Sequence, residues 1–340
     1  MARGIDIGTM FVVSAREDGG AVVFTKERGA YFTFKDEDAT DMLEETGATT
    51  VKIGDTIHAI GDDAIRYANL TAQYQNFHRP MSKGVLNPSE EDAIAILRYI
   101  INGVSGRPAY QGEICAVTSP ADPLDGSFDT TFHRTLLKSH IEKMGYTPII
   151  LNESLAIIYS ENPIIKTDEG DIPFSGIGIS FGAGMVNLVA AWRGKKLVEF
   201  SINQGGDWID QKVSEVTNTP VSKVIKFKET KWGKMDKYNT KDQRLVSALD
   251  IYYDALIETA LTNFIEEFEK QDRSYDDPVE VVIAGGTSLA PNFINKFKAI
   301  FNKLEKPFDL AGVRHARDPL TAVANGALIA AKSYEKKAAK

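Results

Sequence analysis

Gly4-Ile5-Asp6-Ile7-Gly8-Thr9, near the start of the chain, is an apolar run that ends in a glycine turn and carries one carboxylate. Two more glycine turns follow far downstream, in Ser180-Phe181-Gly182-Ala183-Gly184 and Ile283-Ala284-Gly285-Gly286-Thr287-Ser288. Each of the first two turns leads into another strand-like run, at residues 11–15 and 186–192. Because glycine lacks a Cβ, backbone N–H groups in such turns can approach an anion. The two strand–turn–strand units therefore predict a pair of phosphate-binding hairpins.

The third glycine turn leads into a helix instead. Its helical spacing is set by Phe293, Phe297 and Phe301, which we expect in the protein core. The N-terminus of a helix attracts anions through its unpaired N–H groups, so this turn can face a nucleotide. Together the three turns predict a chain that folds around ATP.

The composition sets limits on the class of protein. A chain of 340 residues exceeds one ordinary domain, and 43% hydrophobic residues are enough for sizeable cores. The net charge of −8 argues against nucleic acid as a direct partner. The single cysteine, Cys115, excludes an internal disulfide framework and is expected to be buried. We expect no signal peptide before the first strand, and no apolar run reaches the roughly 20 residues of a membrane helix. We expect a cytoplasmic protein without membrane insertion.

The two halves of the chain repeat one order of elements. The first half predicts a hairpin at 4–15 and 21–26, a third strand at 30–34, an insertion at 36–85, a helix at 90–101, a strand at 113–118 and a helix at 129–144. The second half predicts a hairpin at 177–182 and 186–192, a third strand at 197–202, an insertion at 207–240, a helix at 244–269 and a buried strand at 279–284. This order predicts a duplicated α/β fold of two lobes, with the ligand cleft between them.

Five motifs in this order resemble the superfamily of actins, sugar kinases and heat-shock-chaperone ATPases, and within it the prokaryotic actins of the rod-shape and magnetosome type. The motifs are the first glycine turn, Asn152-Glu153-Ser154-Leu155-Ala156, Gln204-Gly205-Gly206-Asp207-Trp208-Ile209-Asp210, the run at 283–288, and Asp318-Pro319-Leu320-Thr321-Ala322-Val323-Ala324-Asn325-Gly326-Ala327. The resemblance covers nearly the whole chain.

The resemblance implies an actin-like ATPase fold whose two lobes each hold a five-stranded mixed sheet with helices. It implies lobe I at 1–150, lobe II at 151–318 and a C-terminal helix at 319–340 that returns to lobe I. ATP and Mg²⁺ are the implied ligands. The implied partners are further copies of the chain in a head-to-tail cytoskeletal filament, together with a cargo or a regulatory adaptor.

The candidate site residues follow from the motifs. Asp6 and Glu153 are the catalytic candidates. Asp6 is expected to hold Mg²⁺ through water, with a capped turn residue as the alternative. Glu153 is expected to position or activate the attacking water, with a helix N-terminal glutamate as the alternative. The nucleotide-binding candidates are Gly8, Thr9, Met10, Gly182, Ala183, Gly184, Gly205, Gly206, Asp207, Lys226, Glu229, Gly285, Gly286 and Thr287. The alternative for Lys226 and Glu229 is that they lie on an ordinary solvated helix face. The alternative for residues 285–287 is a tight strand-to-helix turn.

The second glycine turn departs from the family pattern. Ser180 stands where the family has an aspartate that helps to hold Mg²⁺, and Gly184-Met185-Val186-Asn187 replaces a Gly-Thr-Thr-Asp-like run. The missing carboxylate predicts slow hydrolysis more than loss of nucleotide binding. The leading hypothesis is an ATPase that polymerises with ATP and disassembles after hydrolysis. The alternatives are a non-filamentous ATP-binding adaptor of a membrane-associated assembly, of the pilus-assembly type, and a small-molecule kinase.

Overall fold

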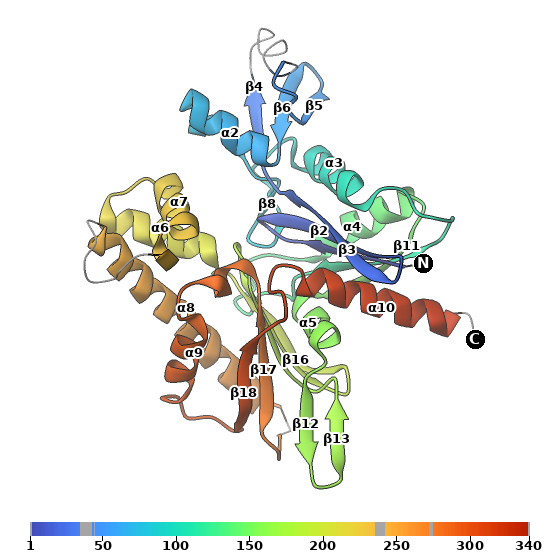
Figure 1. Cartoon of the computed structure of the whole chain (residues 1–340), viewed down its shortest axis with the longest axis vertical. Coiled ribbons are helices and arrows are strands. Elements are labelled where there is room, and N and C mark those ends of the chain that lie inside the picture. The colour runs from blue at the N-terminus through green and yellow to red at the C-terminus, as the bar shows by residue number, and fades with distance from the viewer. Residues whose placement is uncertain (1, 35–42, 44, 235–241, 272–274, 339–340) are drawn as a thin grey trace. The chain divides into compact units, whose positions relative to one another are not determined.

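The computed structural model describes residues 2–34, 43, 45–234, 242–271 and 275–338, and these fall into two units (Figure 1). Unit 1 comprises residues 1–120, 129–152 and 327–340, and unit 2 comprises residues 121–128 and 153–326. The chain therefore passes from one unit to the other after Pro120, Phe128, Asn152 and Gly326. The lobe boundaries expected from the sequence stay a prediction.

The main sheet of unit 1 has the strand order β11-β10-β1-β2-β3. Its strands are β1 (Ala2–Ile7), β2 (Phe11–Asp18), β3 (Ala21–Arg28), β10 (Ile114–Ser119) and β11 (Thr147–Asn152). The strand β1 runs antiparallel to β2 and parallel to β10. Gly19 and Gly20 both have positive φ, which lets a two-residue turn join β2 to β3.

Two helices complete the core of unit 1. The helix α3 (Ala93–Ser105) packs on β2 and β3, and α4 (Thr131–Lys143) packs on β10 and β11. Their apolar stripes meet buried strand residues such as Ile5 and Val117 in one hydrophobic cluster. Cys115 is buried there, as expected, and burial raises the pKa of its thiol.

Unit 1 also contains smaller sheets between β3 and α3. A four-stranded antiparallel sheet has the order β5-β6-β4-β7 and packs against α2 over its own small core. The elements here are β4 (Tyr31–Phe34), β5 (Thr50–Ile53), β6 (Thr56–Ile60), α2 (Asp62–Thr71), η1 (Tyr74–Asn76), β7 (Phe77–His78), β8 (Met81–Ser82) and β9 (Val85–Leu86). Of the insertion predicted at 36–85, residues 36–42 and 44 lie outside the described residues.

The main sheet of unit 2 repeats the topology of unit 1. Its order is β16-β15-β14-β17-β18, formed by β14 (Gly176–Phe181), β15 (Val186–Trp192), β16 (Lys195–Ile202), β17 (Val279–Ala284) and β18 (Leu310–His315). As in unit 1, the first strand pairs antiparallel with the second and parallel with a strand from much later in the chain. The predicted duplicated fold with two five-stranded mixed sheets is confirmed.

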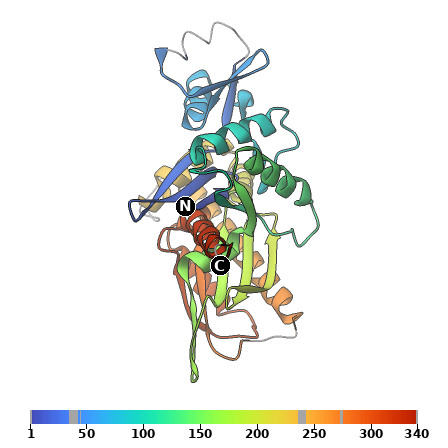
Figure 2. The ribbon, with the colours of Figure 1, turned by 90° about the vertical axis from the view of Figure 1, so that its right-hand side faces the viewer.

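Helices and a projecting hairpin surround the sheet of unit 2. The helices are α5 (Glu153–Glu161), α6 (Gly206–Thr217), α7 (Val221–Thr230), α8 (Gln243–Glu269) and α9 (Phe293–Phe301), with η2 (Trp232–Lys234) and η3 (Gly286–Leu289), while α10 (Ala322–Ala338) begins here and continues into unit 1. The expected core role of Phe293, Phe297 and Phe301 is confirmed. The strands β12 (Ile164–Thr167) and β13 (Gly170–Pro173) form a hairpin that extends from the end of unit 2 (Figures 1 and 2). Residues 235–240 of the predicted second insertion lie outside the described part of the chain.

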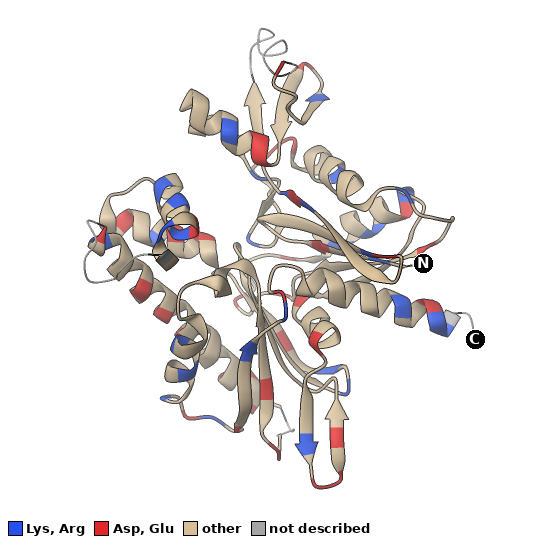
Figure 3. Ribbon diagram, viewed as in Figure 1, with Lys and Arg blue, Asp and Glu red and all other residues tan. Residues whose placement is uncertain are grey.

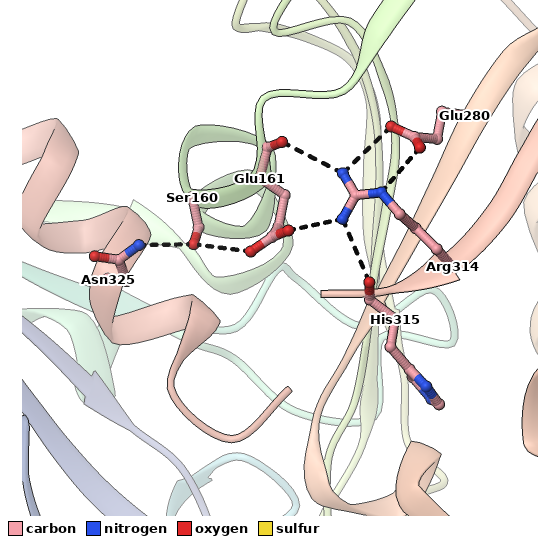
Figure 4. Close-up of polar contacts among 6 residues, drawn as sticks. All are labelled: Ser160, Glu161, Glu280, Arg314, His315 and Asn325. Atoms are coloured by element: carbon pink, nitrogen blue, oxygen red, sulfur yellow. Dashed lines mark hydrogen bonds and ion pairs between the residues drawn. The ribbon is translucent and has the colours of Figure 1, made fainter. Parts of the chain in front are cut away.

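A polar network ties α5 to β17 and β18 and to the start of α10 (Figure 4). Arg314 of β18 donates to Glu280 of β17 at 2.9 Å and to Glu161 of α5 at 2.7 Å. Asn325 donates to the Ser160 hydroxyl at 2.9 Å. This network is structural, because it joins neighbouring elements and satisfies the charges it contains.

The helix α10 lies directly on α5 within unit 2. A Cβ added at Gly326 would be only 1.7 Å from the carbonyl oxygen of Ala156, so the close approach of the two helices requires glycine here. In the described part of the chain, no helix combines the length and the apolar character needed to cross a membrane.

Candidate functional site

The two glycine turns have the same local geometry. In unit 1 the Gly8 N–H donates to the Phe11 carbonyl at 3.0 Å, and in unit 2 the Gly182 N–H donates to the Met185 carbonyl at 2.9 Å. A Cβ at either glycine would lie 3.0 Å from that same carbonyl oxygen. Each unit therefore contains a tight turn between the first two strands of its main sheet, and this turn favours glycine at its first position.

The glycine turn of unit 1 is held by hydrogen bonds from other residues of the same unit. The Thr9 hydroxyl accepts a hydrogen bond from the Gly84 N–H at 2.9 Å, so this predicted nucleotide contact is engaged within the protein. The Met10 carbonyl accepts from the Gly29 N–H, and the Met10 sulfur accepts from Arg28. The amides of Thr9 and Met10 donate no hydrogen bond to the described residues, which leaves them available to an anion.

Asp6 stands beside this turn at the end of β1. The Thr118 hydroxyl donates to Asp6 Oδ1 at 2.9 Å and also lies 3.4 Å from the Ile7 amide. Burial raises the pKa of Asp6 to about 6, against the lowering effect of the Thr118 hydrogen bond. A carboxylate whose pKa rises in this way gains from a nearby cation, so Asp6 fits the predicted Mg²⁺ role.

A further requirement concerns the number of protein ligands. Among the described residues, no group of three or more His, Cys, Asp or Glu side chains is arranged to hold a metal ion. Mg²⁺ usually keeps several waters and takes one or two carboxylates plus substrate phosphates. Asp6 therefore fits Mg²⁺ that arrives with a nucleotide and not a metal site built by the protein alone.

Unit 2 brings three predicted motifs together around its glycine turn. The Gly182 carbonyl accepts from the Gly206 N–H at 3.0 Å and from the Thr287 hydroxyl at 2.8 Å. The Ala183 carbonyl accepts from the Asp207 N–H at 2.8 Å. The first N–H groups of α6 thus hold the carbonyls of the turn, whereas the amides of Ala183 and Gly184 donate to none of the described residues. Within unit 2, the N–H groups of Ala183 and Gly184 are therefore the candidates to bind an anion.

Close packing makes glycine necessary at the positions that surround this turn. A Cβ at Gly205 would lie 2.5 Å from the Ala183 carbonyl oxygen, and one at Gly206 would lie 2.6 Å from the Thr287 hydroxyl. Gly285 has a φ of +90°, and its Cβ would lie 2.3 Å from the Phe181 carbonyl oxygen. We call residues 182–184, 205–207 and 285–287 the cradle of unit 2.

The helix α7, which carries several basic residues (Figure 3), presents a different lysine to the cradle from the one predicted. Lys226 and Glu229 are exposed. Lys228 instead forms a 2.7 Å ion pair with the buried Asp210 of α6, and its ammonium group lies 3.5 Å from the Gly206 carbonyl oxygen. The sequence could have predicted the inward position of Lys228, because it shares one face of α7 with the buried residues Val224 and Phe227.

Glu153, the second catalytic candidate, is the first residue of α5 and is 8% exposed. Asn187 of β15 donates its amide N–H to Glu153 Oε2 at 2.9 Å. Asn187 is the last residue of Gly184-Met185-Val186-Asn187, which replaces the Gly-Thr-Thr-Asp-like run of the actin superfamily. The predictions did not include it among the site residues.

Comparisons with known proteins place the fold in context. The model of the Volactin family matches residues 1–331. The chain belongs to the Volactin family. The match spans nearly the whole chain, including every motif quoted above. A search of curated proteins finds no match to this chain.

Solved structures of prokaryotic actin-like proteins share the fold. MreB5 of Spiroplasma citri bound to ADP is 19% identical, with a TM-score of 0.61, and the alignment covers 100% of this chain and 99% of that one. The MamK double helical filament is 17% identical, with a TM-score of 0.60 and coverage of 97% and 98%. EutJ, an ethanolamine utilization protein from Carboxydothermus hydrogenoformans, is 14% identical, with a TM-score of 0.55 and coverage of 96% and 89%. The predicted resemblance to prokaryotic actins is confirmed at the level of the fold.

Proposed function

We propose that this Volactin family member is an actin-like ATPase that binds Mg-ATP and assembles into filaments. The observation that carries the proposal is the repeated turn, in which Gly8 and Gly182 make the same hydrogen bond at the same place in two copies of one sheet. A repeated glycine turn whose following N–H groups donate to none of the described residues suits the β- and γ-phosphates of a nucleoside triphosphate. Structures with this fold include MreB5 bound to ADP and MamK bound to AMPPNP.

We assign candidate nucleotide contacts in each unit by itself. In unit 1 we assign the amides of Thr9 and Met10 to the phosphates. In unit 2 we assign the amides of Ala183 and Gly184 to the phosphates and residues 285–287 to the adenosine end. Asp6 would hold Mg²⁺ through water, and the bound ion would neutralise charge that develops on the phosphates.

Hydrolysis requires a water molecule held in line with the γ-phosphate. We assign Glu153 to this water. The water oxygen bonds to the γ-phosphorus, the bond to the ADP oxygen breaks, and the proton of the water passes toward the carboxylate. Ser180 supplies no second carboxylate for Mg²⁺, so we propose that turnover is slow.

Assembly rests on the likeness to filament-forming relatives, among them the MamK filament. A head-to-tail contact between different surfaces of identical subunits does not close on itself and so produces an open filament. We propose that nucleotide state alters the contacting surfaces, so that assembly follows ATP binding and disassembly follows hydrolysis. Further copies of the chain are the proposed partners, and a cargo or adaptor would bind the filament.

A non-filamentous ATP-binding adaptor is the second candidate. One observation favours it, because Ser180 is buried and uncharged at the position where the prokaryotic-actin motif that this turn resembles has an aspartate. An adaptor needs nucleotide binding without rapid turnover. The small-molecule kinase has no such support.

Calorimetric titration tests the proposed nucleotide site. ATP and ADP should bind one site per chain in the presence of Mg²⁺ and bind much more weakly with EDTA. Absence of nucleotide binding under both conditions would rule out the ATPase and the adaptor alike. Binding of equal strength with and without Mg²⁺ would remove the role assigned to Asp6.

A further inference from the structure

In unit 2, the buried side-chain amide of Asn187 forms hydrogen bonds through both its NH₂ group and its oxygen. The side chain of Asn187 is 0% exposed. Its Nδ2 donates to Glu153 Oε2 at 2.9 Å, and its Oδ1 accepts from the Ala121 N–H at 3.0 Å. A backbone N–H can only donate, so the bond from Ala121 fixes which end of the amide is the oxygen. The NH₂ group must then face Glu153, where a carboxylate needs a donor.

The two partners of Asn187 occupy special positions along the chain. Ala121 and Glu153 are each the first residue of unit 2 after the chain enters it from unit 1. The Ala121 carbonyl is also held, by the Ser201 hydroxyl at 3.0 Å. Asn187 therefore joins two entry points of the chain to β15 through one buried side chain.

We propose that Asn187 is a positioning residue that acts through Glu153, and this inference rests on the proposed function. The amide holds the Glu153 carboxylate in one rotamer and, as a donor, favours its ionised form. A fixed, ionised carboxylate is what the assigned contact with water needs, since small displacements of such a group cost large factors in rate.

The elements packed around α5 differ in the titratable side chains that they carry. The helix α5 packs on β14, β15 and β17, and on the start of α10, where residues 322–326 carry no titratable side chain. The strands β14 and β15 carry no titratable side chain, and Glu280 of β17 is paired with Arg314 at the far end of α5, beside Glu161. The entering segment at 121–128 adds Asp122 and Asp125, and Asp125 accepts from the Ser127 amide.

The test compares Asn187→Asp with wild type in kcat for ATP hydrolysis at saturating Mg-ATP between pH 5 and 9. This substitution keeps the acceptor for Ala121 and replaces only the donor to Glu153 with a like charge. Two carboxylates in contact share a proton, so the acidic limb of kcat should move up by about one pH unit or more. We expect kcat at pH 7 to fall about tenfold or more and KM to change by less than about threefold, because Asn187 is assigned no contact with nucleotide.

Asn325→Asp is the matched control. It makes the same chemical change in the same unit and removes one hydrogen bond, to Ser160. It should lower the melting temperature without moving the acidic limb. An equal shift of the limb in both variants, or a profile of Asn187→Asp that superimposes on wild type, would overturn the inference while leaving the proposed ATPase in place. A wild-type protein without ATP turnover would instead overturn the proposed hydrolysis and this inference with it.

Two further variants keep the inference testable if Asn187→Asp folds poorly. Asn187→Ala removes the amide donor without adding charge, so kcat should fall while the acidic limb moves little. The exchanged pair Glu153→Gln with Asn187→Asp restores one donor and one acceptor in reversed places. Its melting temperature should exceed that of Asn187→Asp alone while turnover stays low, and no recovery would show that residues 153 and 187 do not act as a pair.

Discussion

Ser180 occupies in β14 the position that Asp6 occupies in β1. Each lies two residues before the first glycine of its turn, and each faces a residue of the next antiparallel strand, Asn187 opposite Ser180 and Val13 opposite Asp6. The backbone of the turn is thus the same in both units, whereas the side chains beside it differ in charge. Unit 1 keeps a carboxylate beside the turn, and unit 2 places uncharged polar side chains there.

Ser180→Asp should restore a second carboxylate for Mg²⁺. We expect nucleotide binding to depend more strongly on Mg²⁺ and ATP turnover to be faster. We also expect a lower melting temperature, because Ser180 is only 4% exposed and a buried charge costs stability. Turnover and thermal unfolding of Ser180→Asp and Ser180→Asn, the uncharged control, provide the comparison. Equal turnover in both variants would argue that Ser180 does not limit the rate.

Asp6→Asn should stabilise the nucleotide-free protein at pH 7 and abolish Mg-dependent nucleotide binding. Burial raises the pKa of Asp6 from 3.8 to about 6, so the folded state binds this proton more tightly than the unfolded state. The stabilising contribution of the protonated form is therefore full below about pH 4 and is lost as the pH rises through 6. At pH 7 the substitution should add on the order of 2 kcal/mol to the free energy of unfolding.

Denaturant unfolding of both proteins at pH 4.5 and pH 7 checks the sign. The difference in the free energy of unfolding between Asp6→Asn and wild type should be large at pH 7 and small at pH 4.5. A difference that does not change with pH would contradict the raised pKa.

Gly205→Ala should damage the cradle of unit 2. The new methyl group would lie 2.5 Å from the Ala183 carbonyl oxygen, so the turn must move and nucleotide affinity should fall at least about tenfold. Gly103→Ala is the control. Gly103 lies in α3 with open space around the added methyl group, and this substitution should stabilise the protein by about 0.5–1 kcal/mol without affecting nucleotide affinity. Titration calorimetry with Mg-ATP distinguishes them.

Lys228→Met should destabilise unit 2, whereas Lys226→Met on the same helix should not. Removing the Lys228 ammonium group leaves the Asp210 carboxylate, whose side chain is only 2% exposed, without its cation, at a cost of about 3 kcal/mol or more. Lys226 is exposed, and its loss should change the free energy of unfolding by less than about 0.5 kcal/mol. Similar urea midpoints for the two variants would show that the ion pair contributes little.

Glu153→Ala should slow phosphate release and leave ATP-dependent assembly intact, because the substitution removes the group assigned to the water and none assigned to the phosphates. A coupled phosphate assay run alongside light scattering measures both. ATP turnover at the wild-type rate in this variant would remove the catalytic assignment of Glu153.

The sequence predicted the fold well because its glycine turns and strand patterns are local signals. Gly8 and Gly182 predict the duplicated hairpins. The helical spacing of Phe293, Phe297 and Phe301 predicts a helix that packs in the core. The sequence reading named no strand at β11, β12, β13 or β18. Their short runs contain or adjoin glycine and proline, as at Pro148 and Gly312, and their pairing depends on distant strands.

The candidate site was predicted in part. The motif glycines of the cradle do meet in unit 2, since a Cβ at Gly205, Gly206 or Gly285 would strike a neighbour. Lys228 and Asn187 were missed as site residues for different reasons. The spacing of Lys228 on α7 contained a usable signal, whereas the link between Asn187 and Glu153 joins residues 34 positions apart and appears only once β15 and α5 are packed.

The central claim is ATP-dependent assembly, and high-speed pelleting with light scattering and negative-stain imaging tests it most directly. Samples would contain Mg²⁺ with ATP, ADP or no nucleotide over a range of protein concentrations. We predict filaments that pellet above a critical concentration with ATP and much less with ADP. A protein that binds ATP but stays in the supernatant at every concentration would contradict the filament proposal and favour the adaptor.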